Sequence, residues 1–287
     1  MQLSETNQII SIKDERLDID KISQCRLSFF ISSYYCQITV FDVRKKQLLL
    51  FESIELKEHK SIIENLELIY HDHILIAAGF WNEVQVFVRN KQFALVPIPI
   101  FDRSMAQQYI ALNDKIDIDK DEFHYKIIDH LGVAVSFGYA SEIKAWFKEK
   151  YPKLSLYFNH QSIAYLNAVS KQLKTKAPSC LFLSINVKEV QIAGFNLERL
   201  AIYNQFSFSD AKQLVKLILL TIEQFSGDGQ LTPIVLHGVK EKVDLNLPVL
   251  KKYFKNIELG ARPSGINMHP FFNELEDQEY VEVLANL

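Results

Sequence analysis

The stretch LSFFISSYYCQITVFD, residues Leu27–Asp42, is rich in aliphatic and aromatic side chains on both sides of a short break at Ser32 and Ser33. Such a pattern is typical of two β-strands joined by a tight turn. It returns in weaker form 154 positions later as LFLSINVKEVQIAGFN, residues 181–196. A few matching positions could arise by chance in alternating strands. The elements that follow each copy also agree in order, however, and this agreement favours an internal duplication.

Each copy belongs to the same succession of predicted elements. The first copy predicts strands at 27–31, 36–43 and 47–54, a helix at 57–70 and a strand at 73–78. The second predicts strands at 180–185, 190–196 and 200–208, a helix from about 210, a break at 226–229 and a strand at 233–237. Ser209 is the expected N-cap of the second helix, because its hydroxyl can accept a hydrogen bond from the first turn. Both copies therefore predict the order β-β-β-α-β.

The segment between the copies is less regular. It predicts a hairpin of strands 83–88 and 93–98, a helix at 102–112, a strand pair at 123–128 and 133–139, a helix at 141–151, a strand at 154–158 and a helix at 161–173. Ser141 and Asn159 are expected to cap the helices that follow them. KQLKTKAP, residues 171–178, is the best linker candidate. We therefore expect a first domain at 1–176, with the hairpin as an insertion, and a second domain at 177–287.

The composition narrows the class of protein. A chain of 287 residues with 48% hydrophobic side chains can bury a substantial core in two domains. The 32 basic and 35 acidic residues leave a formal charge of −3, which gives no support to nucleic-acid binding. The longest mostly apolar run, residues 214–222, is too short to cross a membrane, and the first residues do not resemble a secretory signal. A cytoplasmic protein is therefore expected. Cys25, Cys36 and Cys180 are too scattered for a disulfide framework and are expected to be buried.

The duplicated order resembles the ribonuclease-H-like core of the actin, Hsp70 and sugar-kinase superfamily, and the resemblance covers most of the chain. Within that group the organisation is similar to the pilus-assembly and secretion-platform actin-like proteins. It is closer still to an uncharacterised bacterial family of about this length. The resemblance implies an α/β fold with mixed sheets, in which two ribonuclease-H-like domains take an actin-like arrangement. Because that closest family has no established activity, the resemblance adds fold rather than function.

The chain departs from the superfamily at its phosphate-binding turns. Active members read approximately apolar-D-x-G-T-T across the first strand and turn, and their second strand ends in F-D, which Phe41 and Asp42 match. Here Phe30 stands at the acidic position and Ser32 at the glycine. In the second copy, Ser184 and Asn186 stand at the corresponding positions.

These departures bear on nucleotide chemistry. The acidic residue helps to hold Mg²⁺ or orients the attacking water, and the glycine lets backbone amides approach phosphates. Neither a phenyl ring nor a serine hydroxyl replaces a carboxylate beside a hard dication. Gly238 stands alone where the family usually has a glycine pair near the adenosine. Ser32, Ser33, Asn186 and Gly238 are thus positional remnants of a nucleotide site. We expect no catalytic residue, no metal ligand and no resident cofactor, while ATP with Mg²⁺ remains the alternative.

Three other motifs favour a structural role. The pair His71 and His73 offers two metal ligands without visible partners, so a solvated turn is expected. The run 117–121, DIDKD, opens like a calcium loop but lacks the glycine and the final glutamate, which predicts an acidic surface loop. Tyr34 and Tyr35 would crowd a phosphate site and are expected to pack at the core or its rim, or else to face a protein partner. No Walker loop, G-x-S-x-G elbow or H-E-x-x-H helix occurs in the sequence.

Two classes of function follow. The preferred hypothesis is a non-catalytic actin-like scaffold that self-associates or binds another protein, with edge strands within 84–98, ending at Pro97 and Pro99, as a candidate contact region. The alternative is a divergent ATPase or small-molecule kinase in which Asp42, Asp72 or Asp210 takes over the metal role. A sensor of some other small ligand is a third possibility, although no residue pattern identifies that ligand.

Overall fold

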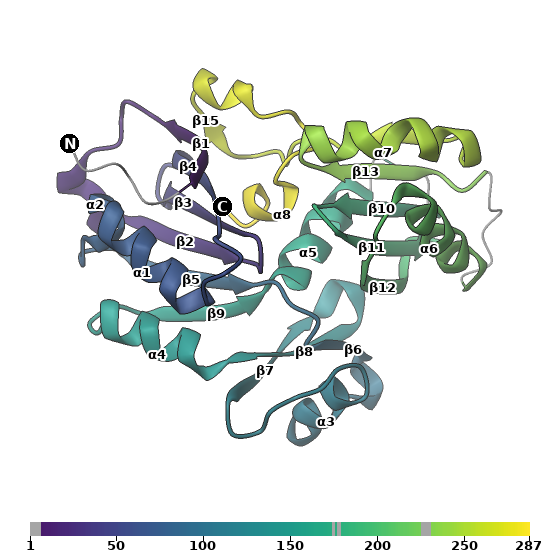
Figure 1. Cartoon of the computed structure of the whole chain (residues 1–287), viewed down its shortest axis with the longest axis horizontal. Helices are drawn as coiled ribbons and strands as arrows, with labels where there is room; N and C mark the ends of the chain where they lie inside the picture. Colours follow the sequence, from purple (N-terminus) through teal and green to yellow (C-terminus); the bar gives the residue numbers. More distant parts are fainter. Residues whose placement is uncertain (1–6, 174–175, 177–178, 225–230) are drawn as a thin grey trace. The chain divides into compact units, whose positions relative to one another are not determined.

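The computed structural model describes residues 7–173, 176, 179–224 and 231–287 (Figure 1). By their internal contacts the residues form two compact units. The first unit holds residues 1–163, 265–273 and 287, and the second holds 164–264 and 274–286. The two compact units meet between Ile163 and Ala164, which lie inside a helix. The boundary predicted between residues 176 and 177 separates the duplicated domains, and it stays a prediction. The predicted break at 226–229 and part of the predicted linker, 171–178, lie outside the described residues.

A large mixed sheet forms the centre of the first unit. Its strand order is β1-β4-β3-β2-β5-β9, and the short β15 pairs with β4. The bounds are β1 Asn7–Lys13, β2 Cys25–Ile31, β3 Tyr35–Asp42, β4 Gln47–Glu55, β5 Glu83–Val88, β9 Leu156–His160 and β15 Asn267–Met268. The strands β2, β3 and β4 are antiparallel neighbours, and β5 lies parallel to β2. Because β2, β3 and β4 are buried along almost their whole length, they read as near-continuous apolar runs.

The predicted fourth strand of the first copy is wrong. Residues 73–78 form the short helix α2, Ile74–Ala77, directly after α1, Ile62–Asp72. The fourth strand is β5, in which Val84 and Val86 are fully buried. A short apolar run such as HILIAA fits a helix or a strand equally well, so periodicity alone could not decide between them.

A second, three-stranded sheet completes the first unit. Its order is β6-β8-β7, with bounds β6 Phe93–Pro97, β7 Asp121–Ile128 and β8 Val133–Ala140. The β7–β8 pair confirms the predicted strand pair. The predicted hairpin of 83–88 with 93–98 is wrong, because β5 joins the large sheet while β6 pairs with β8. Of the contact region proposed at 84–98, only β6 is therefore an edge strand.

Apart from α2, the helices of the first unit follow the expected order. They are α1, α2, α3 Ala106–Ala111, α4 Ser141–Lys150 and the first residues of α5 Gln161–Leu173, with 3-10 turns η1 Ile19–Gln24, η2 Ile98–Ile100, η3 Arg103–Met105, η4 Asp129–Leu131 and η5 Pro270–Glu274. Two predicted caps are wrong. Ser141 is the first residue of α4 and follows the N-cap Ala140, which makes no side-chain capping bond, and Asn159 lies within β9.

In the second unit the β-β-β-α-β elements lie where the sequence predicts them. Its sheet has the order β12-β11-β10-β13-β14, with bounds β10 Cys180–Ile185, β11 Glu189–Asn196, β12 Arg199–Ser207, β13 Ile234–Gly238 and β14 Ile257–Leu259. Its helices are most of α5, α6 Ala211–Gln224, α7 Lys240–Tyr253 and α8 Val281–Leu284. Of these elements, α7, β14 and α8 were not predicted. The cap of α6 differs from the prediction, since Asp210, not Ser209, accepts from the amides of Lys212 and Gln213 at 2.9 Å.

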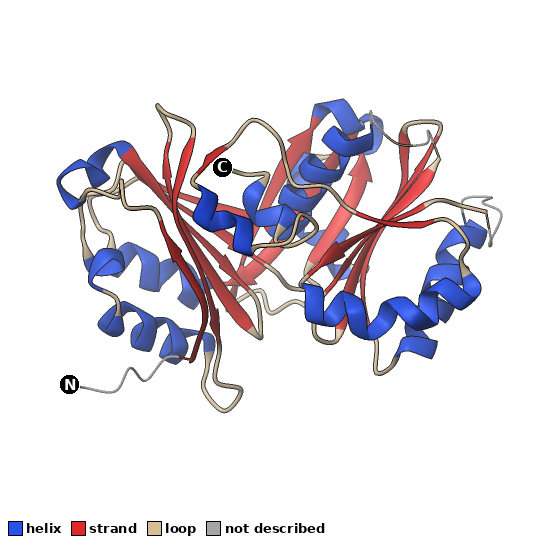
Figure 2. Cartoon of the chain, turned by 90° about the horizontal axis from the view of Figure 1, so that it is seen from above, coloured by secondary structure: helices blue, strands red, loops and turns tan. Residues whose placement is uncertain are grey.

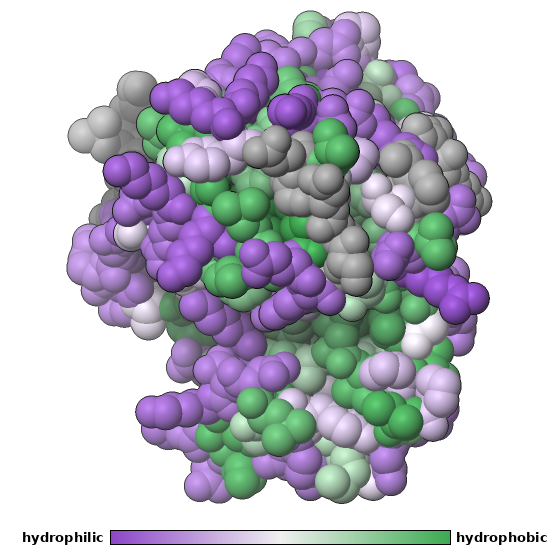
Figure 3. All heavy atoms as spheres, turned by 90° about the vertical axis from the view of Figure 1, so that its right-hand side faces the viewer, coloured by the Kyte–Doolittle hydropathy of each residue, from purple (hydrophilic) through white to green (hydrophobic). Residues whose placement is uncertain are grey.

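Both units bury their helices against the sheets, as Figure 2 shows with strands in red and helices in blue. In the second unit, α6 and α7 pack together on one face of the sheet, and their apolar residues form one core with β10, β11 and β13. On the other face, Tyr165 from α5 contacts the imidazole of His237. Figure 3 shows hydrophilic side chains interspersed with hydrophobic ones over the face that it views.

The two units share one strand order. The first contains β4-β3-β2-β5 and the second contains β12-β11-β10-β13, each with the fourth strand parallel to the first. In each, a helix precedes that fourth strand, so both follow the predicted order β-β-β-α-β. In the described part of the chain, every helix is too short or too polar to cross a bilayer.

Candidate functional site

The turn between β2 and β3 is closed by the side chain of Ser32. Its Oγ accepts from the amides of Tyr34 and Tyr35 at 3.2 and 2.9 Å and donates to the carbonyl of Tyr35 at 3.1 Å. A hydroxyl has one proton and two lone pairs, so these three bonds use its whole capacity. The amides that a glycine turn would present to a phosphate are thus taken up inside the turn. Ser33, the neighbouring residue of the predicted site, is exposed.

Phe30, at the position where active members of the superfamily have an acidic residue, forms an aromatic pair with Phe87. Its side chain is fully buried, and its ring is stacked on that of Phe87 with centroids 4.4 Å apart and an interplanar angle of 3°. The two residues are direct partners in the parallel ladder of β2 and β5. Ring stacking adds to the free energy gained by burying both rings. A carboxylate at this position would lie in an apolar environment without water.

The turn between β10 and β11 is also closed on itself. The amide of Asn186 donates to the carbonyl of Glu189 at 2.8 Å, and its side-chain Oδ1 accepts from the amide of Val187 at 2.9 Å. Ser184, at the acidic position, is buried between its ladder partners Gln191 and His237. Here the short polar side chain occupies one amide of the turn, against two in the first unit.

Gly238 is required by a close approach of two strands. Its φ is +127°, and a Cβ added here would lie 2.2 Å from the carbonyl oxygen of Ile185, its partner on β10. Only glycine adopts this conformation without strain. Its amide donates to the carbonyl of Gln278 at 3.0 Å, so the C-terminal part of the chain occupies this group as well.

A carboxylate from the same C-terminal segment caps helix α7. The Oε1 of Glu279 accepts from the amide of Lys240 at 2.8 Å, and its Oε2 accepts from the amide of Glu276 at 3.1 Å. Lys240 Nζ lies 2.8 Å from Glu276 Oε1. Helix N-termini attract anions because their first amides are unpaired and the helix dipole is positive there. Glu279 is buried and serves as that anion. Sequence analysis missed it, because no local pattern links it to a helix that begins 39 residues earlier.

Of the three carboxylates considered for a relocated metal site, Asp42 and Asp210 accept backbone amides elsewhere. Asp42 lies at the end of β3 opposite the Ser32 turn, and its Oδ1 accepts from the amides of Arg44 and Lys45 at 3.0 and 2.9 Å. Strands rise about 3.3 Å per residue, so the length of β3 separates Asp42 from that turn by roughly 20 Å. Asp210 caps α6, and Asp72 ends α1. Among the residues that the structure describes, no three His, Cys, Asp or Glu side chains are grouped to hold a metal ion.

Comparison with known proteins identifies the family. The family described as "Protein of unknown function (DUF3822)" matches residues 14–257, most of the chain. The chain belongs to the DUF3822 family. No curated protein matches its sequence.

Solved structures confirm the actin-like fold of this DUF3822 protein. A protein from Bacteroides thetaiotaomicron with an actin-like ATPase fold and unknown function has a TM-score of 0.80 at 17% identity, covering 94% of this chain and 98% of that one. A PilM–PilN type IV pilus biogenesis complex has a TM-score of 0.60 at 12% identity, covering 91% and 96%. At these identities the likeness concerns the fold alone.

His73 is a structural residue of the DUF3822 chain and not part of the solvated turn that we predicted. Its Nε2 lies 2.8 Å from Oε2 of the buried Glu52, and its Nδ1 accepts from the amide of Ile76 at 3.4 Å. Because Nδ1 accepts, this pattern favours the tautomer with a proton on Nε2, the nitrogen that faces the carboxylate. Ser11 Oγ donates to the other oxygen of Glu52 at 2.9 Å. The histidine therefore caps α2 and lies beside a buried acid.

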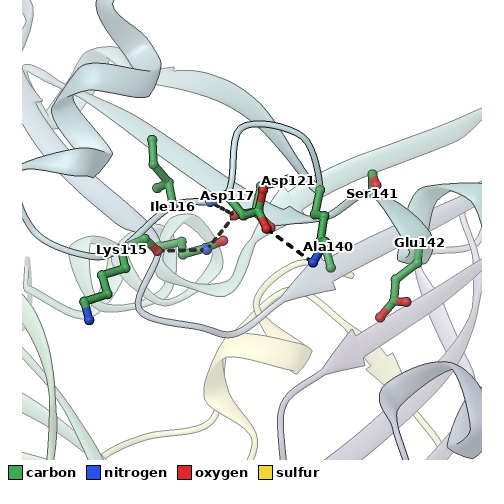
Figure 4. Close-up of a pocket in the computed structure, with 9 residues that line it drawn as sticks. Lys115, Ile116, Asp117, Asp121, Ala140, Ser141 and Glu142 are labelled. Carbon is green, nitrogen blue, oxygen red and sulfur yellow. Dashed lines mark hydrogen bonds and ion pairs between the residues drawn. The ribbon is translucent and has the colours of Figure 1, made fainter.

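The acidic loop at 117–121 borders a surface hollow of about 470 Å³ (Figure 4). Asp121 Oδ2 accepts from the amide of Asp117 at 2.8 Å and from the side-chain amide of Gln92 at 2.9 Å. Lysines 115 and 120 lie beside these acids and Glu142 in the lining. The charges in this hollow are thus mixed, and the carboxylate of Asp121 serves the loop itself.

Two buried histidines and the three cysteines are held in their neutral forms. Burial lowers the pKa of His160 and of His237 to about 3, so both imidazoles are uncharged at neutral pH. All three cysteines are free and buried, as predicted, and burial raises the pKa of Cys25 and of Cys180 to about 11. Neutral buried thiols are poor nucleophiles. These groups therefore belong to the core.

Proposed function

We propose that this DUF3822 protein is a non-catalytic member of the actin-like fold that works as a scaffold, by binding another protein or by self-association. The observation that carries the proposal is that backbone amides at the predicted nucleotide-site turn of the first unit, and at and beside Gly238 in the second, are bonded within the protein. Ser32 takes the amides of Tyr34 and Tyr35, while Gln278 and Glu279 take those of Gly238 and Lys240. A phosphate at the Ser32 turn, or an adenosine beside Gly238, would have to displace the internal bonds at that position.

Electrostatics support the same proposal. Binding a metal–triphosphate needs carboxylates close to the phosphates to hold the cation. Phe30 and Ser184 supply none, and the candidate replacements Asp42 and Asp210 already accept backbone amides elsewhere. The fold itself keeps two compact units with ordered cores, which can present surfaces whether or not nucleotide binds. The PilM–PilN structure is a complex between two proteins, and it offers a precedent for this use of the fold.

Calorimetry with Mg-ATP and Mg-ADP, followed by chemical cross-linking in extract of the source cells, tests the proposal. We expect no heat of nucleotide binding, together with cross-linked species that contain a second copy or a specific partner. Nucleotide binding in the micromolar range would contradict the proposal. So would a protein that stays monomeric and cross-links to nothing.

A further inference from the structure

A groove in the first unit concentrates positive charge and aromatic surface. It has a volume of about 520 Å³ and is lined by residues of β7, β8, β9 and α4, with Gln85 of β5. Figure 1 shows these elements beside one another. Three lysines line it, Lys126, Lys144 and Lys148, and its lining contains no aspartate or glutamate. A chain with a net charge of −3 thus presents a locally basic hollow.

Two of the three lysines are available to a ligand. Lys126 and Lys148 are exposed, and within the described ranges no ion pair involves either of them. Lys144 is held by Glu122, with Nζ and Oε2 2.7 Å apart. Lys144 and Lys148 are one helical turn apart on α4, so they project from the same face of the helix. Burial lowers the pKa of His124, and the imidazole adds no charge at neutral pH.

The floor of the groove includes an unpaired sheet edge. Strand β9 ends the order of the large sheet and, among the described strands, pairs only with β5. The amide of Val84 donates to the carbonyl of Ser155 at 3.0 Å. In a parallel ladder this bond means that the amides and carbonyls of Tyr157 and Asn159 point toward β5. The amides and carbonyls of Leu156 and Phe158 therefore point away from β5. Those groups can pair with another extended chain.

We infer that this groove binds an extended acidic segment of a partner protein, which adds as a strand to β9 and places its carboxylates against Lys126 and Lys148. The inference rests on the proposed scaffold function and names the partner's chemistry. Charge complementarity selects an acidic chain over a basic one. The exposed ring of Tyr157, 49% accessible, offers an apolar contact on the same strand. The other hollow, beside 117–121, has mixed charge and gives no such preference.

The binding test uses a short fluorescein-labelled peptide of alternating glutamate and valine, measured by fluorescence anisotropy at low salt. We expect saturable binding that the double variant Lys126→Glu/Lys148→Glu weakens by at least about tenfold. The matched control, Lys212→Glu/Lys216→Glu on α6, changes the net charge equally at two exposed lysines and should bind as the wild type does. Equal affinity for both double variants would overturn the assignment of the groove.

Two methylated peptides test the strand pairing. One carries N-methyl groups on the glutamates and the other on the valines, so each blocks one hydrogen-bonding edge of the extended peptide. We expect one form to lose binding and the other to keep it, because only one edge of an added strand faces β9. If both methylated peptides bind equally well, the peptide does not pair with the edge of β9. The strand-addition part of the inference would then be wrong.

Cross-linking in cell extract separates this inference from the scaffold proposal. If wild type and the Lys126→Glu/Lys148→Glu variant capture the same partner equally well, the groove is not the binding site, and the scaffold proposal stands. If the variant loses a partner that the Lys212→Glu/Lys216→Glu control keeps, the groove is supported. Nucleotide binding by the wild-type protein would count against the scaffold proposal, whatever the peptides do.

Discussion

Single side chains decide what the inherited turns can do. The departure at Phe30 and Ser184 is visible in the sequence, because both stand in strands whose pattern otherwise matches. The sequence does not reveal that Phe30 stacks on Phe87, or that the hydroxyl of Ser32 fills its own turn. Those facts depend on the register of β2 with β5 and on the exact path of a four-residue turn. Pattern reasoning therefore identifies what is missing but not what replaces it.

Replacing Ser32 by glycine should destabilise the protein although it restores the family's residue. The change removes a hydroxyl that makes three hydrogen bonds within the turn and adds backbone freedom to the unfolded chain. We expect a loss of about 1–2 kcal/mol in the free energy of unfolding, measured by urea denaturation. Ser33→Gly, at the exposed neighbour, is the control and should cost clearly less.

Gly238→Ala should be among the most damaging small substitutions in the chain. The added methyl would lie 2.2 Å from the carbonyl oxygen of Ile185, at a φ that L-residues rarely adopt. We expect a loss above about 3 kcal/mol, or failure to fold, because the clash is with backbone. Gly79→Ala is the control, since nothing lies within 4 Å of its added Cβ. Similar unfolding midpoints for the two variants would show that β13 and β10 can separate at Gly238.

At the scale of elements, the duplicated β-β-β-α-β order was predicted correctly in the second unit and only in part in the first, and nothing predicted α7 or β14. The strands of the second unit are regular apolar runs separated by clear breaks, and each lies where the sequence places it. In the first unit, the short apolar run after His73 became a helix. The fourth strand is β5 and not the predicted strand at 73–78. Because β5 pairs with β2, it does not form the predicted hairpin. Short apolar runs are ambiguous, and tertiary pairing resolves them.

Helix α7 should depend on a carboxylate that is distant in sequence. Glu279→Ala removes the acceptor for the amide of Lys240 and leaves the helix N-terminus without its anion. We expect a loss of about 1 kcal/mol in the free energy of unfolding. Glu241→Ala is the control, because that side chain is 80% exposed and lies in the same first turn. A loss for Glu241→Ala as large as that for Glu279→Ala would point to general charge effects and not to the cap.

At the scale of the whole molecule, stability should fall as the solution becomes acidic. The pKa of His160 and of His237 is about 3 in the folded protein, because burial disfavours the charged ring, against about 6.5 in the unfolded chain. Between these values the unfolded state binds more protons, so acid favours unfolding. Their contribution is complete above about pH 6.5 and is lost progressively toward pH 3.

Urea denaturation at several pH values measures this dependence. We expect the free energy of unfolding to decrease from pH 7.5 to pH 5, by at most about 1.4 kcal/mol per pH unit for each histidine. His160→Gln should flatten the slope, even if it also lowers stability at neutral pH. His130→Gln, at an exposed histidine, should leave the slope unchanged. A slope that is the same in all three proteins would mean that other groups govern the acid response.

The central claim is that backbone amides at the proposed remnants of a nucleotide site, and at the adjoining N-terminus of α7, are occupied by the protein itself. Amide NMR of the labelled protein during titration with Mg-ATP tests it most directly, by following the signals of Tyr34, Tyr35, Gly238 and Lys240. The account predicts that these four signals keep their positions up to millimolar nucleotide, because Ser32, Gln278 and Glu279 hold the groups. Saturable shifts of these signals would contradict it.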